Sequence, residues 1–249
     1  FTPRGVAVAS DGSLWVAGGT MVAHVAADGD VIAQVEAPHF DASPEAREEF
    51  AEEARAAHAA ELESTAKMIE RQAEMVEELE GKEKDEPGWQ PGEIVEMYRT
   101  STAAMKVRLE SRRAMTEQQV VDEAVERVKQ IHRVAVTPES LFLVTNMESG
   151  HGFAIWRCSL DLSERERVVS DLAGCCGQMD IQAVADRIVI AENSRHRVRV
   201  VGLDGEPVAQ FGETSRTDVT KGFGGCCNPM NTCASSDGSL LTSESNGLV

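Results

Sequence analysis

One pattern recurs four times along the chain, and it constrains the fold more than any other feature of the sequence. Two short alternating apolar runs are joined by a tight turn, and two further runs follow around another turn. Residues 5–36 show the pattern best, with Asp11-Gly12 and Asp28-Gly29 at the turns. Asp-Gly between alternating apolar runs is a strong hairpin signal because glycine accepts the positive φ that the turn requires. Each complete copy therefore predicts four short antiparallel strands.

The further copies begin at Arg133, Met179 and Met230, and the last contains only the first part of the pattern. Four strands are the content of one β-propeller blade, and internal repetition on this scale is typical of radial arrays and solenoids. We therefore predict a mainly β fold, a β-propeller of which about three and a half blades are visible. Because such rings usually close with roughly 4 to 8 blades, we expect the remaining blades to lie outside this segment.

The third copy carries a more specific signature. Residues 191–212 read AENSRHRVRVVGLDGEPVAQFG, in which an acidic-Asn-x-x-His-Arg turn leads into a Val-rich strand, a Gly-containing turn and a final strand. This stretch resembles the NHL repeat, and His196 stands where that motif has its histidine. The other copies share the strand pattern without the Asn-His-Arg signature. The resemblance implies an NHL-like β-propeller, in which we interpret His196 as a structural turn residue.

Between the first and second copies the apolar period changes from 2 to about 3.6, which is typical of helices. Ser43-Pro44 provides an N-cap followed by proline at the first helical position, and Gly81 is expected to end this helix. A return helix is predicted from about Glu93, and a third opens at Thr116 with a capping box to Gln119. We therefore predict an antiparallel helical hairpin with an extra short helix, inserted between two blades.

The long predicted helices carry apolar residues at the three- and four-residue spacing of a coiled coil. The apolar faces comprise Leu62, Ala66, Ile69, Ala73 and Val76 on the first helix, and Ile94, Tyr98, Met105 and Leu109 on the return helix. From these faces we assign an interaction arm to Leu62, Ile69, Val76, Ile94, Tyr98 and Met105. A hairpin of this length buries only a narrow seam against itself. Two interpretations therefore stay open: a solvated structural hairpin, and an arm that docks a protein partner or a second copy of the chain.

These signals divide the chain into four parts, and the charge is unevenly shared among them. The first blade spans 1–37, the inserted arm 38–132, the second and third blades 133–225, and the start of a fourth blade 226–249. The formal net charge is −18, and residues 41–93 alone hold 17 Asp and Glu against 6 Lys and Arg. Such a field repels phosphate backbones, so we expect no nucleic-acid partner. No apolar run approaches the roughly 20 residues of a membrane span.

Four of the six cysteines form two adjacent pairs in matching contexts, GCCGQMD at 174–180 and GCCNPMN at 225–231. Cys175-Cys176 and Cys226-Cys227 each precede the first strand of a blade, so a propeller would place both pairs near its channel mouth. Three interpretations compete: vicinal disulfides in an oxidising compartment, thiolates that bind a metal or an iron–sulfur cluster, and buried reduced thiols. The usual zinc pair is Cys-x-x-Cys, so the spacing favours the disulfides.

No phosphate-binding loop, zinc-protease helix or nucleophile elbow is present, and the catalytic residues are unknown. Some NHL-type propellers are lyases or hydrolases with a metal on the axis, where Asp180 would point, but we interpret Asp180 as a cap at the start of its strand. We expect a non-catalytic binding or scaffold propeller, periplasmic or secreted. The alternative is a metal-dependent or redox enzyme with a thiolate-bound metal or cluster at the axis.

Overall fold

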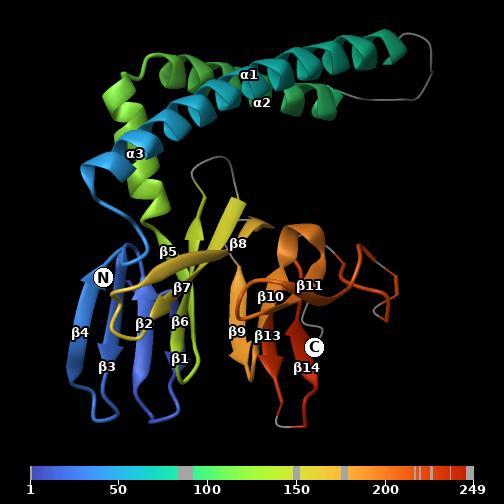
Figure 1. Ribbon diagram of the computed structural model, residues 1–249. Coiled ribbons are helices and arrows are strands. Elements are labelled where there is room, and N and C mark those ends of the chain that lie inside the picture. The colour runs from blue at the N-terminus through green and yellow to red at the C-terminus, as the bar shows by residue number, and fades with distance from the viewer. Residues whose placement is uncertain are drawn as a thin grey trace. The chain divides into compact units, whose positions relative to one another are not determined.

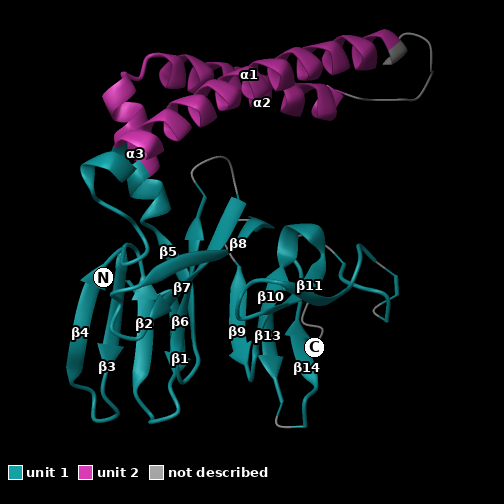
Figure 2. Cartoon of the chain, viewed as in Figure 1, with its two compact units in different colours: residues 1–47, 125–249 teal, residues 48–124 magenta. Residues whose placement is uncertain are grey.

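The computed structural model describes residues 2–83, 92–147, 152–174, 179–215, 217–218, 220–224, 227–235 and 237–244. Its described part is mainly β and contains four antiparallel sheets together with three α-helices (Figure 1). The chain forms two compact units (Figure 2). One comprises Phe1–Arg47 and Val125–Val249 and holds every sheet, and the other, Glu48–Ala124, is helical.

Each repeat predicted from the sequence forms one sheet. The first sheet contains β1 (Gly5–Val8), β2 (Leu14–Gly18), β3 (Met21–Val25) and β4 (Val31–Glu36). The second contains β5 (Ile131–Val136), β6 (Ser140–Asn146), β7 (Gly152–Ser159) and β8 (Arg165–Ala173). The third contains β9 (Asp180–Val184), β10 (Arg187–Glu192), β11 (Arg197–Gly202) and β12 (Pro207–Phe211), and the fourth β13 (Asn231–Ala234) and β14 (Leu240–Ser243). Strand order in every sheet follows the sequence, so each sheet is a simple meander.

The predicted Asp-Gly turns are confirmed in the first sheet. Gly12 and Gly29 have φ values of 85° and 98°, the left-handed region that favours glycine. The Asp11 carboxylate accepts a hydrogen bond from the Ser13 amide at 2.9 Å, which fixes the first turn. Both hairpins therefore form where local chemistry alone placed them.

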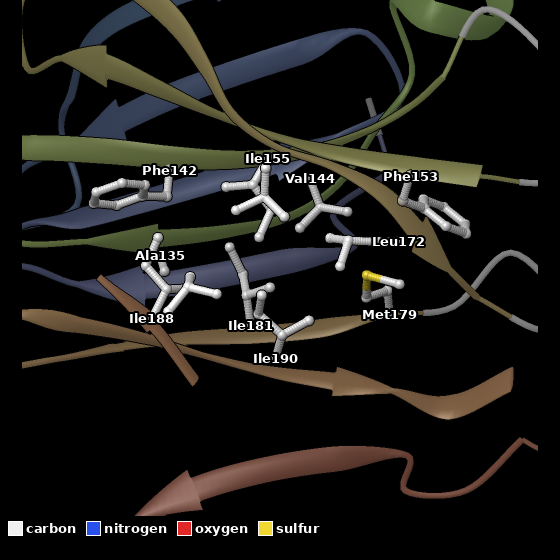
Figure 3. Close-up of a cluster of buried hydrophobic side chains, with 12 residues drawn as sticks. Ala135, Phe142, Val144, Phe153, Ile155, Leu172, Met179, Ile181, Ile188 and Ile190 are labelled. Atoms are coloured by element: carbon white, nitrogen blue, oxygen red, sulfur yellow. The ribbon is translucent and has the colours of Figure 1, made fainter. Parts of the chain in front are cut away.

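Successive sheets pack face to face, and their first strands lie side by side. Strand β5 contacts β1 and β9, and β9 contacts β13. The largest core lies between the second and third sheets, where Phe142, Val144 and Ile155 point toward Ile181, Ile188 and Ile190 (Figure 3). A smaller core joins the first and second sheets and includes Trp15, Ala17, Leu141 and Leu143. Burial of these faces holds the series of sheets together.

The turn between β10 and β11 of the third sheet is organised by a buried acid. Glu192 is fully buried, and its Oε1 accepts hydrogen bonds from the Ala173 amide at 3.1 Å and from Arg195 Nη1 at 2.9 Å. Its Oε2 accepts a hydrogen bond from Arg197 Nε. His196 follows the short 3₁₀ turn with φ of 53° and reverses the chain there. The acidic residue of the motif thus ties its own turn to the end of β8, in the preceding sheet.

The inserted helices are α1 (Pro44–Glu83), α2 (Gly92–Arg113) and α3 (Glu117–Val128). The Thr116 amide donates to Gln119 Oε1 at 2.9 Å and the Gln119 amide to Thr116 Oγ1 at 3.2 Å, which confirms the capping box. The prediction that Gly81 ends the first helix is wrong, because α1 continues to Glu83. A glycine costs a helix about 1 kcal/mol relative to alanine, which near an end does not suffice to stop it.

The seam of the helical unit differs from the predicted one at two positions. Val95 is 5% exposed and Ile94 46% exposed, so Ile94 does not belong to the buried face. One residue turns a helix by about 100°, which carries Ile94 off the face that Val95 shares with Tyr98, Thr102, Met105 and Leu109. Ala73 is likewise exposed.

On α1 the predicted residues Leu62, Ile69 and Val76 do lie at buried or half-buried positions. A polar layer interrupts the apolar seam, where Thr102 Oγ1 donates to Gln72 Oε1 at 2.9 Å. Because each hydroxyl or amide buried here needs a partner, this layer fixes the register of α2 against α1.

A buried histidine follows β4. His39 Nε2 donates to the Val128 carbonyl at 2.9 Å, and the ring lies 5.8 Å from that of Trp156. The described residues provide no partner for His39 Nδ1. Burial, aided by the charge of Arg165, lowers the pKa of His39 from 6.5 to about 4.

We expect His39 to make the free energy of unfolding depend on pH. The folded state keeps the ring neutral, so its contribution is complete above pH 6.5 and is lost as the pH falls toward 4. The loss amounts to about 3 kcal/mol, since one pKa unit corresponds to about 1.4 kcal/mol. Urea unfolding between pH 7 and 4 should show a shallower pH dependence for His39→Gln than for the unaltered chain. Equal slopes would contradict the assignment.

Candidate functional site

The first strands of the four sheets together line a cavity of about 570 Å³. Its walls are residues 4–8, 133–136, 180–183 and Asn231, one segment from each sheet. Gly5 allows the close approach of β1 and β5, because a Cβ there would lie 3.0 Å from Arg133 Cα and Val134 N. The cavity is a product of sheet packing, since its walls are far apart in the sequence.

Arg133 connects the first three sheets at the cavity wall. Its Nη1 donates to the Arg4 carbonyl at 2.6 Å and to the His132 carbonyl at 2.8 Å. Its Nε lies 3.6 Å from Asp180 Oδ1. A guanidinium offers five N–H groups in a fixed plane, so one side chain can hold β1, β5 and β9 in register.

Asp180 extends this connection to the fourth sheet. Its Oδ2 accepts hydrogen bonds from the Thr232 amide at 2.9 Å and the Thr232 hydroxyl at 3.4 Å. Burial raises the pKa of the Asp180 carboxyl above its usual value, although Thr232 and Arg133 act in the opposite direction. Gln182 adds a parallel link by accepting a hydrogen bond from the Ala234 amide at 3.2 Å. The interpretation of Asp180 as a local cap misses this role, because its partners belong to other sheets.

The hydrogen bonds of this network explain why the cavity wall is polar, so no ligand is needed to explain its polar side chains. Arg133, Asp180 and Gln182 are each engaged with a neighbouring strand. Within the described residues no group of three or more His, Cys, Asp and Glu side chains could hold a metal ion. What the arrangement does, on these contacts, is to align the first strands of successive sheets.

The adjacent cysteines fall largely outside the described residues, which exclude Cys175, Cys176 and Cys226. Cys227 is half-buried and has a φ of 63°. Their pairing as disulfides and their service as metal ligands therefore both stay predictions. Two other cysteines are free thiols, Cys158 in the core and Cys233 on the surface. Burial raises the pKa of Cys158 to about 11, which leaves it an unreactive thiol.

The helical unit presents a surface that the sequence reasoning missed. Along α2, five exposed and uncharged residues recur at spacings of three and four: Met97, Thr100, Ala104, Val107 and Ser111. We call this set the outer stripe. Met97 is 59% and Val107 73% exposed. The outer stripe is offset by two residues from the buried seam and therefore lies on the opposite side of α2. The sequence contains a signal for it, because these uncharged residues form a second series with the same spacing of three and four.

No model of a known protein family matches the chain, and no curated protein matches its sequence. The likeness of residues 191–212 to the NHL repeat therefore stays a resemblance. No α-helix in the described part of the chain is long and apolar enough to cross a membrane.

The contacts of Asp180 predict that two substitutions at this position lower the free energy of unfolding by different amounts. Asp180→Ala leaves the buried Thr232 amide without its acceptor, which should lower the free energy of unfolding by about 1 to 3 kcal/mol. Asp180→Asn keeps an oxygen at that position and should cost less than half as much. Urea unfolding at pH 7 measures both values. Equal losses for the two variants would show that the charge facing Arg133 matters more than the hydrogen bond to Thr232.

Proposed function

We propose that this chain is a non-catalytic binding or scaffold protein, in which an NHL-like β-propeller carries a helical arm that engages a protein partner. Consecutive meander sheets with side-by-side first strands are the arrangement expected of propeller blades. The cavity between those first strands then corresponds to the wall of a central channel. In such a ring, the hydrogen bonds and the ion pair of Arg133 and Asp180 in the cavity wall align neighbouring blades.

The outer stripe is the observation that carries the binding role. Residues 41–93 of the arm are strongly acidic. Helix α2 nevertheless exposes a continuous uncharged surface, because the residues of the outer stripe recur at spacings of three and four. Exposed apolar patches rimmed by charge mark interaction sites, and helices are commonly read through residues spaced by three and four. The partner we propose is a protein that offers an apolar groove or helix to this stripe.

A salt-bridge network prepares the arm for binding. Arg112 Nη2 lies 2.9 Å from Glu61 of α1, and Arg112 Nη1 lies 2.6 Å from Glu123 of α3. The Arg112 side chain is only 15% exposed, so these contacts are partly shielded from water. One residue of α2 thereby holds all three helices. A surface that is ordered before binding loses less conformational entropy when the partner docks.

Vicinal disulfides at Cys175-Cys176 and Cys226-Cys227 would stiffen the turns that lead into β9 and β13, and they require an oxidising compartment such as the periplasm or the cell exterior. The alternative, a metal-dependent or redox enzyme, has no observation in its favour among the described residues. Metal retained by those thiolates would favour that alternative.

Affinity capture tests whether the partner binds the outer stripe, with a stripe variant and a control variant that change the net charge equally. Met97→Glu with Val107→Glu changes the net charge by −2 and should lower recovery of the partner at least about tenfold, because buried interface positions dominate affinity. Lys106→Glu makes the same change in charge at an exposed position outside the stripe and should leave recovery unchanged. Quantitative mass spectrometry of the retained proteins gives the ratio. Proteins retained equally by all three forms would show that the stripe is not the binding surface.

The state of the cysteine pairs is open to intact-mass and peptide mass spectrometry of the unreduced protein. We expect a deficit of two hydrogens for each pair, located within peptides that contain both members of that pair. Alkylation without reduction should then label Cys233 and leave the four paired residues unmodified. Full alkylation of the pairs would contradict the disulfides and indicate reduced thiols, whereas metal retained in native spectra would favour the enzyme alternative.

A further inference from the structure

The outer stripe of α2 has the periodicity of one side of a coiled coil. Its five residues are separated by three, four, three and four positions, which is the alternation of the two seam positions in a heptad repeat. Met97 is 59% and Val107 73% exposed, so both side chains are available to a helix that packs on this side. The structure that completes such a series is a second helix with the same spacing.

The order of side-chain sizes along the outer stripe matches the same stripe turned end for end. Met97 and Val107 flank the smaller residues Thr100 and Ala104. In an antiparallel pair, Met97 of one helix packs on Val107 of the other, and Thr100 packs on Ala104. The small central residues allow the two helix axes to approach, so that the larger side chains can be buried in the outer layers. The stripe is thus complementary in size to a second copy of itself.

The charges of the three helices favour a contact through α2. Helix α1 carries 13 Glu against 5 Lys and Arg, and α3 carries 4 Asp and Glu against 1 Arg. Helix α2 differs, because its 5 Lys and Arg exceed its 3 Glu. The outer stripe lies on the side of α2 opposite to α1, so pairing through this stripe joins the two helices that are net positive and keeps the acidic α1 helices apart.

The distribution of charge along α2 favours the antiparallel orientation. Glu93 and Glu96 lie at the N-terminal end of the outer stripe, and Arg108 lies near its C-terminal end. A parallel pair would place Glu93 against its own copy beside an apolar contact, which is unfavourable. An antiparallel pair instead places Glu93 opposite Ser111. It also brings Glu96 to the level of Arg108 and sets opposite ends of the two helix dipoles side by side.

We propose that the partner of the outer stripe is a second copy of this chain, bound through the same stripe in an antiparallel contact between the two α2 helices. A two-fold axis between Thr100 and Ala104 relates the copies, so the contact is isologous and closes at two chains. This inference rests on the proposed binding role of the outer stripe and identifies its partner. It does not depend on the arrangement or the number of the sheets.

Size-exclusion chromatography with light scattering tests the contact over a series of concentrations. The mass of the unaltered chain should rise with concentration from 26.9 kDa toward twice that value and no further. Val107→Glu and Met97→Lys should each raise the dissociation constant at least about tenfold, because the new charge faces an apolar residue in both outer layers. Lys106→Gln makes the same change in charge as Val107→Glu, at an exposed position outside the stripe, and should leave the dissociation constant unchanged.

An equimolar mixture of the two disruptive variants tests the orientation. In an antiparallel pair, the lysine of Met97→Lys faces the glutamate of Val107→Glu in one outer layer, and the other outer layer regains its contact between Met97 and Val107. The mixture should therefore dimerise more tightly than either variant alone. A parallel pair provides neither match, so a mixture that is no tighter than the single variants would overturn the proposal.

The self-contact can fail while the binding role of the outer stripe stands. An unaltered chain that is monomeric at every concentration, or whose mass grows beyond two copies, would overturn the self-contact. Capture of a different protein that is lost with Met97→Glu and Val107→Glu would then retain the binding role with another partner. Circular dichroism should be the same for all variants, because the substituted side chains are exposed.

Discussion

Face-to-face burial of short meander sheets is the interaction on which the rest of this structure depends. A single four-stranded sheet of this size has two faces and cannot shield both, so each repeat gains stability only through its neighbours. Phe142 and Ile188, from adjacent repeats, are fully buried against one another's sheet. The side-by-side first strands and the cavity between them follow from this one arrangement.

Polar groups between neighbouring sheets fix the geometry in which the apolar faces of those sheets pack. Area burial has little directional preference, whereas a buried donor or acceptor must meet a partner at a fixed distance and angle. Glu192 holds the turn between β10 and β11 to the preceding sheet, and Asp180 joins the third sheet to the fourth. His39 plays the same part in the segment after β4 by donating to the Val128 carbonyl. Their substitution would loosen the register of the sheets before it removed much buried area.

The proposed scaffold role agrees with the distribution of surfaces. Arg133, Asp180 and Gln182 of the cavity wall are each hydrogen-bonded to a neighbouring strand. Among the described residues, the outer stripe of α2 is an exposed and uncharged surface. Such surfaces bind other proteins through complementary shape and burial.

Local chemistry in the sequence determined the elements. Asp-Gly turns, the Ser43 cap and the Thr116 capping box placed strands and helices because each depends on residues within a few positions of one another. The sequence did not determine which side of α2 is buried, because two apolar neighbours such as Ile94 and Val95 fit the same spacing equally well. Ile94 was therefore assigned to the face that Val95 occupies. The partners of Asp180 and Glu192 and the cavity were decided only by tertiary structure. They depend on which sheets meet, and long-range packing leaves no signal in local spacing.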